Sequence, residues 1–194
     1  MRFHRTVAHG DVVQVRGQLE RVDEKSSGRI FCFGLYGFVD GELAYEGKTK
    51  FFIRGTSKKR GSKKPAPAAP QEPPAPTVER EQQVAVDQAI RYADASGDHN
   101  PIHVDESIAK AAGLPGCILH GLCTMALAQR DAVNQLAGGN PERLKYLSVR
   151  WAKPVFPGET LNLKVWDQGG GSYSFVTENS SGNAVITNGH IEIG

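Results

Sequence analysis

The chain lacks the patterns that would place it in several large classes of protein. Its three cysteines, Cys32, Cys117 and Cys123, form no Cys-x-x-Cys pair, so they indicate neither a disulfide framework nor a thiolate metal site. No stretch approaches the ~20 apolar residues that a membrane-spanning helix needs, and no apolar signal segment follows Met1. We therefore expect no membrane partner and a reducing compartment, the cytoplasm.

A strong excess of charge of one sign is also absent. The formal net charge of +2 and the 23% of charged residues describe an ordinary surface, so we expect no nucleic-acid partner. Five of the basic residues cluster in one tract, Lys58, Lys59, Arg60, Lys63 and Lys64. We interpret this tract as a solvated linker that can weakly attract an acidic partner, and contact with nucleic acid or a membrane is the alternative.

Proline is abundant in the same region, and large apolar side chains are almost missing. Residues 57–78 therefore cannot bury enough surface to offset the entropy of ordering, which predicts a linker. The linker divides the chain into residues 1–56 and residues 79–194.

After the linker, the hydrophobic period predicts helices and then strands. Three helices are predicted, from Val86 to Gly97, from Glu106 to Ala112 and from Leu122 to Leu136. The apolar face of the longest helix consists of Leu122, Met125, Ala126, Gln129, Val133 and Leu136. From Arg143 onward the period changes to two, and Gly-rich turns predict an antiparallel meander that ends near Ile193.

The first 56 residues repeat the pattern of the C-terminal meander. Gly10 and Asp11 precede an alternating run as Gly158 and Glu159 do. We expect three strands without a central helix, whose apolar face must pack against the C-terminal part, for example by extending its sheet. That face includes Phe31, Phe33, Tyr45 and Phe51.

Residues 92–109 carry the densest group of chemically active side chains. Asp98 and His103 lie on a stretch punctuated by Gly97 and Pro101, between two predicted helices. A carboxylate and an imidazole held close together on a rigid turn can bind and deprotonate one water molecule. The pattern indicates an enzyme.

The same stretch resembles the signature of the MaoC-like, R-specific enoyl-CoA hydratase (hydratase 2) family. The family pattern is an aromatic residue, then Ser/Thr-Gly-Asp-x-Asn-Pro-aliphatic-His, and finally Ala/Ser after five more residues. It is met here by Tyr92, Ser96, Gly97, Asp98, Asn100, Pro101, Ile102, His103 and Ala109. Two further stretches, Leu119 to Gly121 and Arg150 to Gly158, also resemble family landmarks.

The resemblance implies an α+β hotdog fold, in which an antiparallel sheet wraps a long central helix. Residues 79–194 would form this catalytic domain, and residues 1–56 would be a partial second hotdog repeat. The implied reaction is hydration of trans-2-enoyl-CoA to (3R)-3-hydroxyacyl-CoA, or the reverse dehydration, without a cofactor or metal. The direction, and the choice between CoA and acyl carrier protein, stay open. Because hotdog units generally pair, the resemblance also implies a homodimer.

The resemblance also implies roles for particular residues. Asp98 and His103 would handle the water, and the backbone N–H of Gly121 would stabilise negative charge on the thioester oxygen. Gly121 suits this role because it opens the core helix, where unpaired N–H groups meet the positive end of the helix dipole. Asn100 would brace the loop and help to position the water. His120 is a candidate for the substrate site, but a helix start or a packing position is favoured over a catalytic role.

Structural and functional alternatives accompany these assignments. Asp98 can cap the turn after Gly97, His103 can be a buried structural histidine, and Asp94 and Asp105 are expected to be solvated or capping. A metal site at Asp98, His99 and His103 is disfavoured, since three ligands on one tight turn hardly converge on one ion. The other functions are a hotdog thioesterase and a noncatalytic acyl-thioester-binding partner subunit. A pure scaffold has no need of Asp98 and His103.

Overall fold

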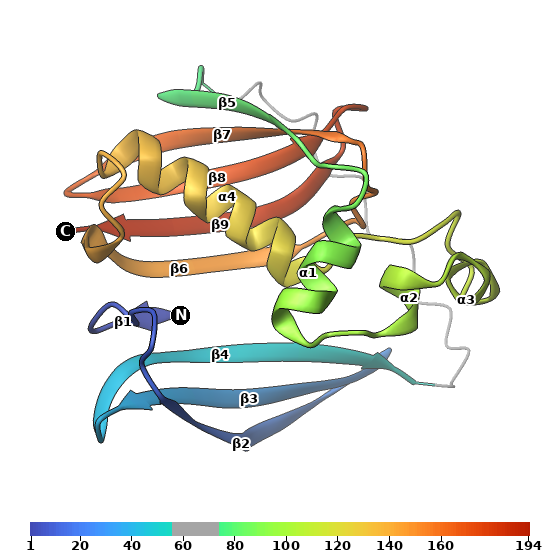
Figure 1. Ribbon diagram of the computed structural model, residues 1–194, viewed down its shortest axis with the longest axis horizontal. Helices are drawn as coiled ribbons and strands as arrows, with labels where there is room; N and C mark the ends of the chain where they lie inside the picture. Colours follow the sequence, from blue (N-terminus) through green and yellow to red (C-terminus); the bar gives the residue numbers. More distant parts are fainter. Residues whose placement is uncertain (56–73) are drawn as a thin grey trace. The chain divides into compact units, whose positions relative to one another are not determined.

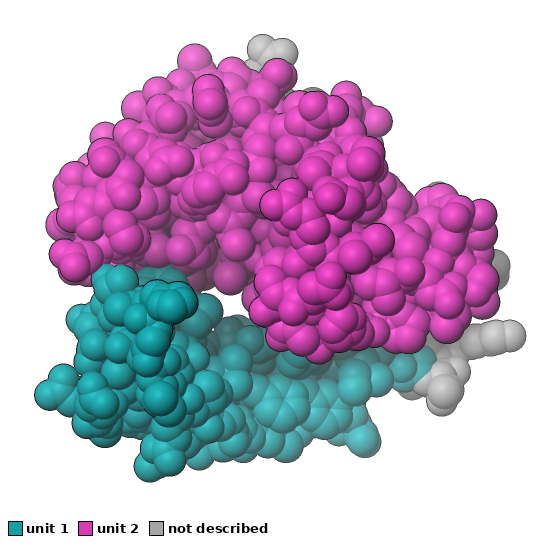
Figure 2. Space-filling view, viewed as in Figure 1, with its two compact units in different colours: residues 1–74 teal, residues 75–194 magenta. Residues whose placement is uncertain are grey.

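The structure, a computed structural model, describes residues 1–55 and 74–194. It divides into two compact units, Met1–Pro74 and Ala75–Gly194 (Figure 2). Most of the predicted linker lies outside the described residues, but its last residue, Val78, already begins a strand. Within residues 1–55 and 74–194, no helix is both long enough and apolar enough to cross a membrane.

The first unit is an antiparallel sheet of three long strands with a short strand at its edge (Figure 1). The strands are β1 (Arg2–Phe3), β2 (Val13–Lys25), β3 (Gly28–Val39) and β4 (Glu42–Arg54), in the order β2-β3-β4-β1. Asp40 and Gly41 connect β3 to β4 with φ of 51° and 83°, the conformation of a tight type I′ hairpin. The three predicted strands are confirmed.

One face of this first sheet is apolar. The register places Leu19 opposite Phe33 and Phe31 opposite Phe51, and the rings of Phe33 and Phe51 meet edge to face at 5.9 Å. Several large side chains of the sheet are more than half exposed, namely Val15, Leu19, Phe51 and Ile53. Of the four residues predicted on this face, Phe51 is exposed, whereas Phe31, Phe33 and Tyr45 are half-buried.

The second unit contains a five-stranded antiparallel sheet in the order β6-β9-β8-β7-β5. Its strands are β5 (Val78–Gln83), β6 (Leu144–Trp151), β7 (Thr160–Gly169), β8 (Ser172–Asn179) and β9 (Ala184–Ile193). The predicted meander is confirmed for β7, β8 and β9, which pair in sequence order, but β6 pairs with β9 instead of with β7. The predicted alternation is present on β7, where Leu161, Leu163 and Val165 are buried while the residues between them are not. Strand β5 was not predicted: its sequence is polar, and its pairing with β7 determines its conformation.

The helices of the second unit follow the predicted order, with one addition. They are α1 (Gln88–Ser96), α2 (Pro101–Val104), α3 (Glu106–Ala111) and α4 (Gly121–Leu136), followed by the 3-10 turn η1 (Pro141–Arg143). The additional helix, α2, carries His103. Val86 was predicted to begin the first helix, but it precedes α1 and is 82% exposed.

Helix α4 lies across one face of the second sheet (Figure 1), but it buries a different side from the one predicted. Leu122, expected in the core, is 53% exposed, and of the predicted apolar face only Val133 is fully buried. The buried residues of α4 are Cys123, Thr124, Ala128, Asp131, Ala132 and Val133. Most of them are small, which allows the helix to pack closely on the sheet. The prediction relied on the helical spacing of the larger apolar side chains and therefore chose another face.

The core of the second unit joins α1, α4 and the sheet. It consists of Val84, Ala89, Leu119, Cys123, Val155, Leu161 and Val185, with Tyr92 and Leu127 packed against it. Cys123 belongs to this core, while Cys117 is only partly buried. Because Ala89 and Cys123 belong to one cluster, the start of α1 and the start of α4 are held close together.

Candidate active site

Helix α1 delivers the chain to Asp98. Gly97 ends the helix in the left-handed conformation, with φ of 74°, and its N–H donates to the carbonyl of Ala93 at 2.8 Å. The N–H of Asp98 donates to Ser96 Oγ at 3.2 Å, and Asp98 Oδ1 accepts from the N–H of Asn100 at 3.3 Å. Asp98 therefore braces the turn with one oxygen. Its other oxygen, Oδ2, has no hydrogen-bond partner in the described part of the chain.

Asn100 starts the short helix that carries the imidazole. Its Oδ1 accepts from the N–H of Ile102 at 3.4 Å, and Pro101 occupies the first helical position, where a missing N–H costs nothing. The N–H of His103 donates to the carbonyl of Asn100 at 3.0 Å. The expected bracing by Asn100 is present in this geometry.

His103 is buried and held in one tautomer. Its Nδ1 lies 2.8 Å from the carbonyl oxygen of Ile118. Since a carbonyl only accepts, Nδ1 carries the hydrogen and Nε2 keeps a basic lone pair. Burial lowers the pKa of His103, with His120 acting in the same direction, while the bond to Ile118 and the charge of Asp98 oppose the shift. The neutral, proton-accepting imidazole is favoured near neutral pH.

His120 connects the acid to the imidazole. It is 2% exposed, and its Nε2 donates to the backbone carbonyl of Asp98 at 2.8 Å. Its ring stacks on His103 at 3.8 Å between centroids and also contacts Tyr92 at 4.8 Å. Its Nδ1 is buried and has no hydrogen-bond partner among the described residues. His120 precedes α4 as the N-cap residue, so the predicted helix start and packing position are both observed.

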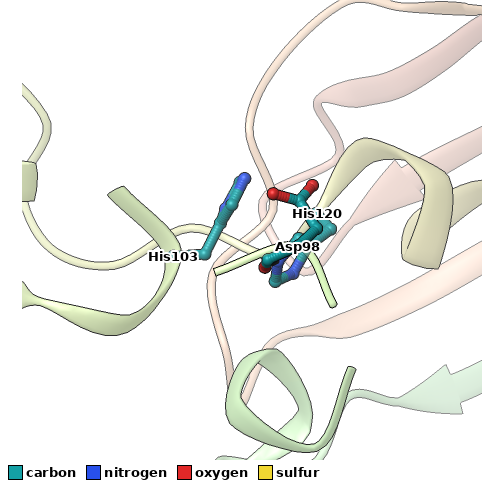
Figure 3. A group of neighbouring side chains, drawn as sticks. All are labelled: Asp98, His103 and His120. Carbon is teal, nitrogen blue, oxygen red and sulfur yellow. Dashed lines mark hydrogen bonds between the residues drawn. The ribbon is translucent and has the colours of Figure 1, made fainter. Parts of the chain in front are cut away.

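The side chains of Asp98, His103 and His120 converge, although they come from three segments (Figure 3). One carboxylate oxygen and one nitrogen of each imidazole all lie within 4.8 Å of one another. A single water that makes hydrogen bonds of about 2.8 Å to both Asp98 and His103 can span a gap of this size. The two side chains are therefore placed to share one water.

The same three groups are a poor metal site. A metal ion lies close to the plane of each imidazole that binds it, about 2.0 to 2.1 Å from the nitrogen for zinc. The rings of His103 and His120 are stacked with only 27° between their planes, so their lone pairs run side by side rather than toward one point. His99, which the sequence offered as a ligand, is exposed and does not belong to the group.

Gly121 begins α4 directly after His120. The side chain of His120 forms no cap, so the first N–H groups of the helix have no side-chain acceptor there. The carbonyl of Gly121 accepts a hydrogen bond from Trp151 Nε1 at 2.7 Å. This contact was not predicted: Trp151 was placed in a strand and in the stretch from Arg150 to Gly158 that resembles a family landmark, and local sequence carries no signal for a contact across 30 positions.

Other predicted polar residues lie outside the group. Asp105 caps α3, since its Oδ1 accepts from the N–H groups of Ser107 and Ile108 at 2.9 and 3.1 Å, which confirms a capping role. The same bonds, together with the one from the Ser107 hydroxyl, lower the pKa of Asp105. Asp94 is exposed, as expected for a solvated residue.

The sequence is similar to that of several known proteins. A family model described as "MaoC like domain" matches residues 66–189. The peroxisomal multifunctional enzyme type 2 of Mus musculus is 32% identical over 88% of this chain and 23% of its own length. The 3-hydroxyacyl-thioester dehydratase Y of Mycobacterium tuberculosis is 34% identical over 92% of this chain and 63% of its own length.

A solved structure supports the fold. The crystal structure of a MaoC-like dehydratase from Phytophthora capsici superimposes with a TM-score of 0.87 and 28% identity, covering 100% of this chain and 69% of that one. The chain spans less than two thirds of the length of the mouse and mycobacterial relatives.

Proposed function

Because the chain belongs to the MaoC-like dehydratase family and has its hotdog fold, we propose that it hydrates trans-2-enoyl thioesters to (3R)-3-hydroxyacyl thioesters and catalyses the reverse dehydration. One observation carries the proposal: Asp98 and His103 present an oxygen and a nitrogen within 4.8 Å of each other, where burial lowers the pKa of the imidazole. The substrate would be an acyl-CoA or an acyl carrier protein thioester.

The chemistry begins with the shared water. Asp98 orients the water, and Nε2 of His103 removes one proton as the oxygen forms a bond to C3 of the enoyl group. The π electrons of the C2–C3 bond move toward the thioester, which leaves an enolate with negative charge on the carbonyl oxygen. The proton held by the Asp98–His103 pair is then delivered to C2, so the enzyme returns to its starting state.

The enolate oxygen needs a hydrogen-bond donor in a fixed position. Gly121 supplies a backbone N–H at the positive end of α4, the sixteen-residue helix of the second unit. Loss of one such donor typically costs about 2.7 to 4 kcal/mol in the activation barrier. Asn100 contributes by capping α2, which fixes His103 relative to Asp98.

The fixed position of His120 favours a structural role, in which it holds Asp98 and His103 in place, over proton transfer. Its Nε2 is committed to the carbonyl of Asp98, and its ring lies against His103. It thereby holds the backbone of the acid and the plane of the base in one arrangement. A role at the substrate site would use Nδ1, the nitrogen without a partner among the described residues.

Two assays run side by side test the reaction class. Crotonyl-CoA loses the absorbance of its conjugated enoyl thioester on hydration, whereas a thioesterase releases a free thiol that a thiol reagent detects. The proposal predicts loss of this absorbance without thiol release, formation of the 3R product, and a rate that depends on acyl chain length. Thiol release without hydration would support a thioesterase, and no reaction with any chain length would support a noncatalytic binding subunit.

A further inference from the structure

Trp151 makes an unusually close contact with Gly121. Its Nε1 donates to the Gly121 carbonyl at 2.7 Å. A Cβ added to Gly121 would lie 3.1 Å from Nε1, 3.3 Å from Cδ1 and 3.4 Å from Cε2 of the indole. Separations near 3.1 Å are tighter than ordinary van der Waals contacts, so a side chain at position 121 would require the ring to move by a few tenths of an ångström. The indole thus occupies the side of Gly121 where any other residue would place its Cβ.

The tryptophan is mounted on a rigid part of the fold. It ends β6, where the register pairs it with Ile186, which is fully buried on β9. The next residue, Ala152, donates its N–H to the carbonyl of Val185 at 2.9 Å. The backbone at Trp151 and at Ala152 is therefore held by pairing with β9.

The N–H of Gly121, by contrast, is not engaged by a cap side chain. Gly121 is the first residue of α4, it is exposed, and the N-cap side chain of His120 bonds elsewhere. Glycine is also the residue with the greatest backbone freedom. A donor that must meet developing charge in a fixed direction needs an external restraint, because electrostatic stabilisation is effective only when the donor is oriented in advance.

We infer that Trp151 is a positioning residue for the oxyanion site, which holds the Gly121 backbone through its indole N–H and favours glycine at position 121. This inference rests on the proposed function, since it assigns a restraint to the donor in that mechanism. It also accounts for a large aromatic residue that remains 43% exposed at the end of a strand.

Three variants separate the parts of this contact. Trp151→Phe keeps an aromatic ring but removes the N–H, Trp151→Ala removes both, and Gly121→Ala introduces the clash. Trp166→Phe is the matched control, because it changes the only other tryptophan of the sequence, which lies on β7. Melting temperatures of all variants establish that they are folded before any rate is compared.

The kinetic readout is the split between kcat and KM for hydration of an enoyl-CoA. Removing an oxyanion donor typically lowers kcat by about 10² to 10³, and a displaced donor is expected to cost less, roughly tenfold for Trp151→Phe with KM changed less than about threefold. The Trp166→Phe control should retain the rate of the unmodified protein. Gly121→Ala should lose activity in the natural background, yet should add little further loss to Trp151→Ala, because the ring it would strike is gone.

A spectroscopic readout requires no turnover. The absorption of a cinnamoyl thioester moves to longer wavelength when a hydrogen bond polarises its carbonyl, so the bound spectrum reports the donor directly. We expect a clear red shift with the natural protein and with Trp166→Phe, and a smaller one with Trp151→Phe. A folded Trp151→Phe variant with unchanged kcat and an unchanged red shift would overturn the inference while leaving the hydratase proposal intact. Absence of hydration and of any red shift in the natural protein would instead remove the proposed function itself.

Discussion

At the scale of single residues, the protonation state of His103 decides whether the site can work. The hydrogen on Nδ1 is engaged with the carbonyl of Ile118, so the proton from water must go to Nε2. Protonation of Nε2 before the reaction would remove the base. Burial opposes that protonation by lowering the pKa of the side chain below its ordinary 6.5.

This lowered pKa predicts the acidic limb of the pH profile. The neutral imidazole is the active form, so its fraction, and with it kcat/KM, falls as pH falls through the pKa of His103. Because that pKa is lowered, kcat/KM should stay level through neutral pH and reach half of its plateau below pH 6.5, the ordinary value. The check is kcat/KM for crotonyl-CoA at constant ionic strength. A half-point above 6.5 would show that burial does not control this group.

At the scale of secondary-structure elements, α2 is the short piece that aligns the base with the acid. Its start depends on Asn100, which accepts from the N–H of Ile102. The chain contains a matched case in Asn140, which accepts from the N–H of Glu142 at 2.9 Å and also precedes a proline, at the start of η1. The two caps have similar chemistry, but only the helix that Asn100 starts contains a proposed catalytic residue, His103.

The paired variants Asn100→Ala and Asn140→Ala therefore separate stability from activity. Each should lower the free energy of unfolding by about 0.5 to 2 kcal/mol, the usual cost of losing a side-chain cap. Only Asn100→Ala should also lower kcat, because it releases the turn between Asp98 and His103. Urea unfolding and initial hydration rates provide the two measurements. Equal losses of activity in both variants would mean that α2 has no special part in aligning the site.

The elements also show which information the sequence carries. Period-two runs predicted β7 to β9 because alternate residues there are buried on one face, and Gly97 predicted a helix end because it adopts a positive φ. On β6 the alternation fails in part, because Leu147 is buried but Trp151 is 43% exposed. Strand β5 was missed, since its polar side chains reveal nothing about pairing with β7. The prediction of the buried face of α4 was wrong, because small residues such as Ala128 pack on the sheet while Leu122 is exposed.

The residues of the candidate site likewise fall into those that local sequence predicts and those that it does not. The motif around Asp98, Asn100 and His103 is local, so the sequence could place these residues on one turn. The contacts of His120 and Trp151 are long-range: the first joins positions 22 apart and the second positions 30 apart. Such contacts depend on how α1, α4 and β6 pack, which no local pattern specifies.

At the scale of the whole molecule, the second unit leaves large apolar side chains in contact with solvent. The exposed ones are Val86, Ile90, Val104, Ile108, Leu122 and Trp151. Burial of apolar surface contributes roughly 25 cal/mol per Å², so covering part of this surface favours association. We propose that residues 79–194 of two chains pair as a homodimer.

Sedimentation velocity over a range of protein concentrations tests this pairing. We expect a species of twice the chain mass of 21.0 kDa, and a shift toward monomer when Ile90, 55% exposed on α1, is replaced in Ile90→Glu. Glu142→Gln, a change at an exposed position on η1, serves as the control and should leave the dimer intact. A monomer that persists at the highest concentration would contradict the proposal.

The central claim is that Asp98 and His103 act together on one water, and the most direct measurement is the initial rate of crotonyl-CoA hydration by Asp98→Asn and His103→Gln. Both substitutions preserve the approximate size of the side chain and remove its acid–base function. Because general acid–base catalysis typically contributes about 10² to 10⁴ in rate, each variant should lose at least about a hundredfold in kcat while keeping the melting temperature of a folded protein. Turnover at the natural rate in either folded variant would contradict the account.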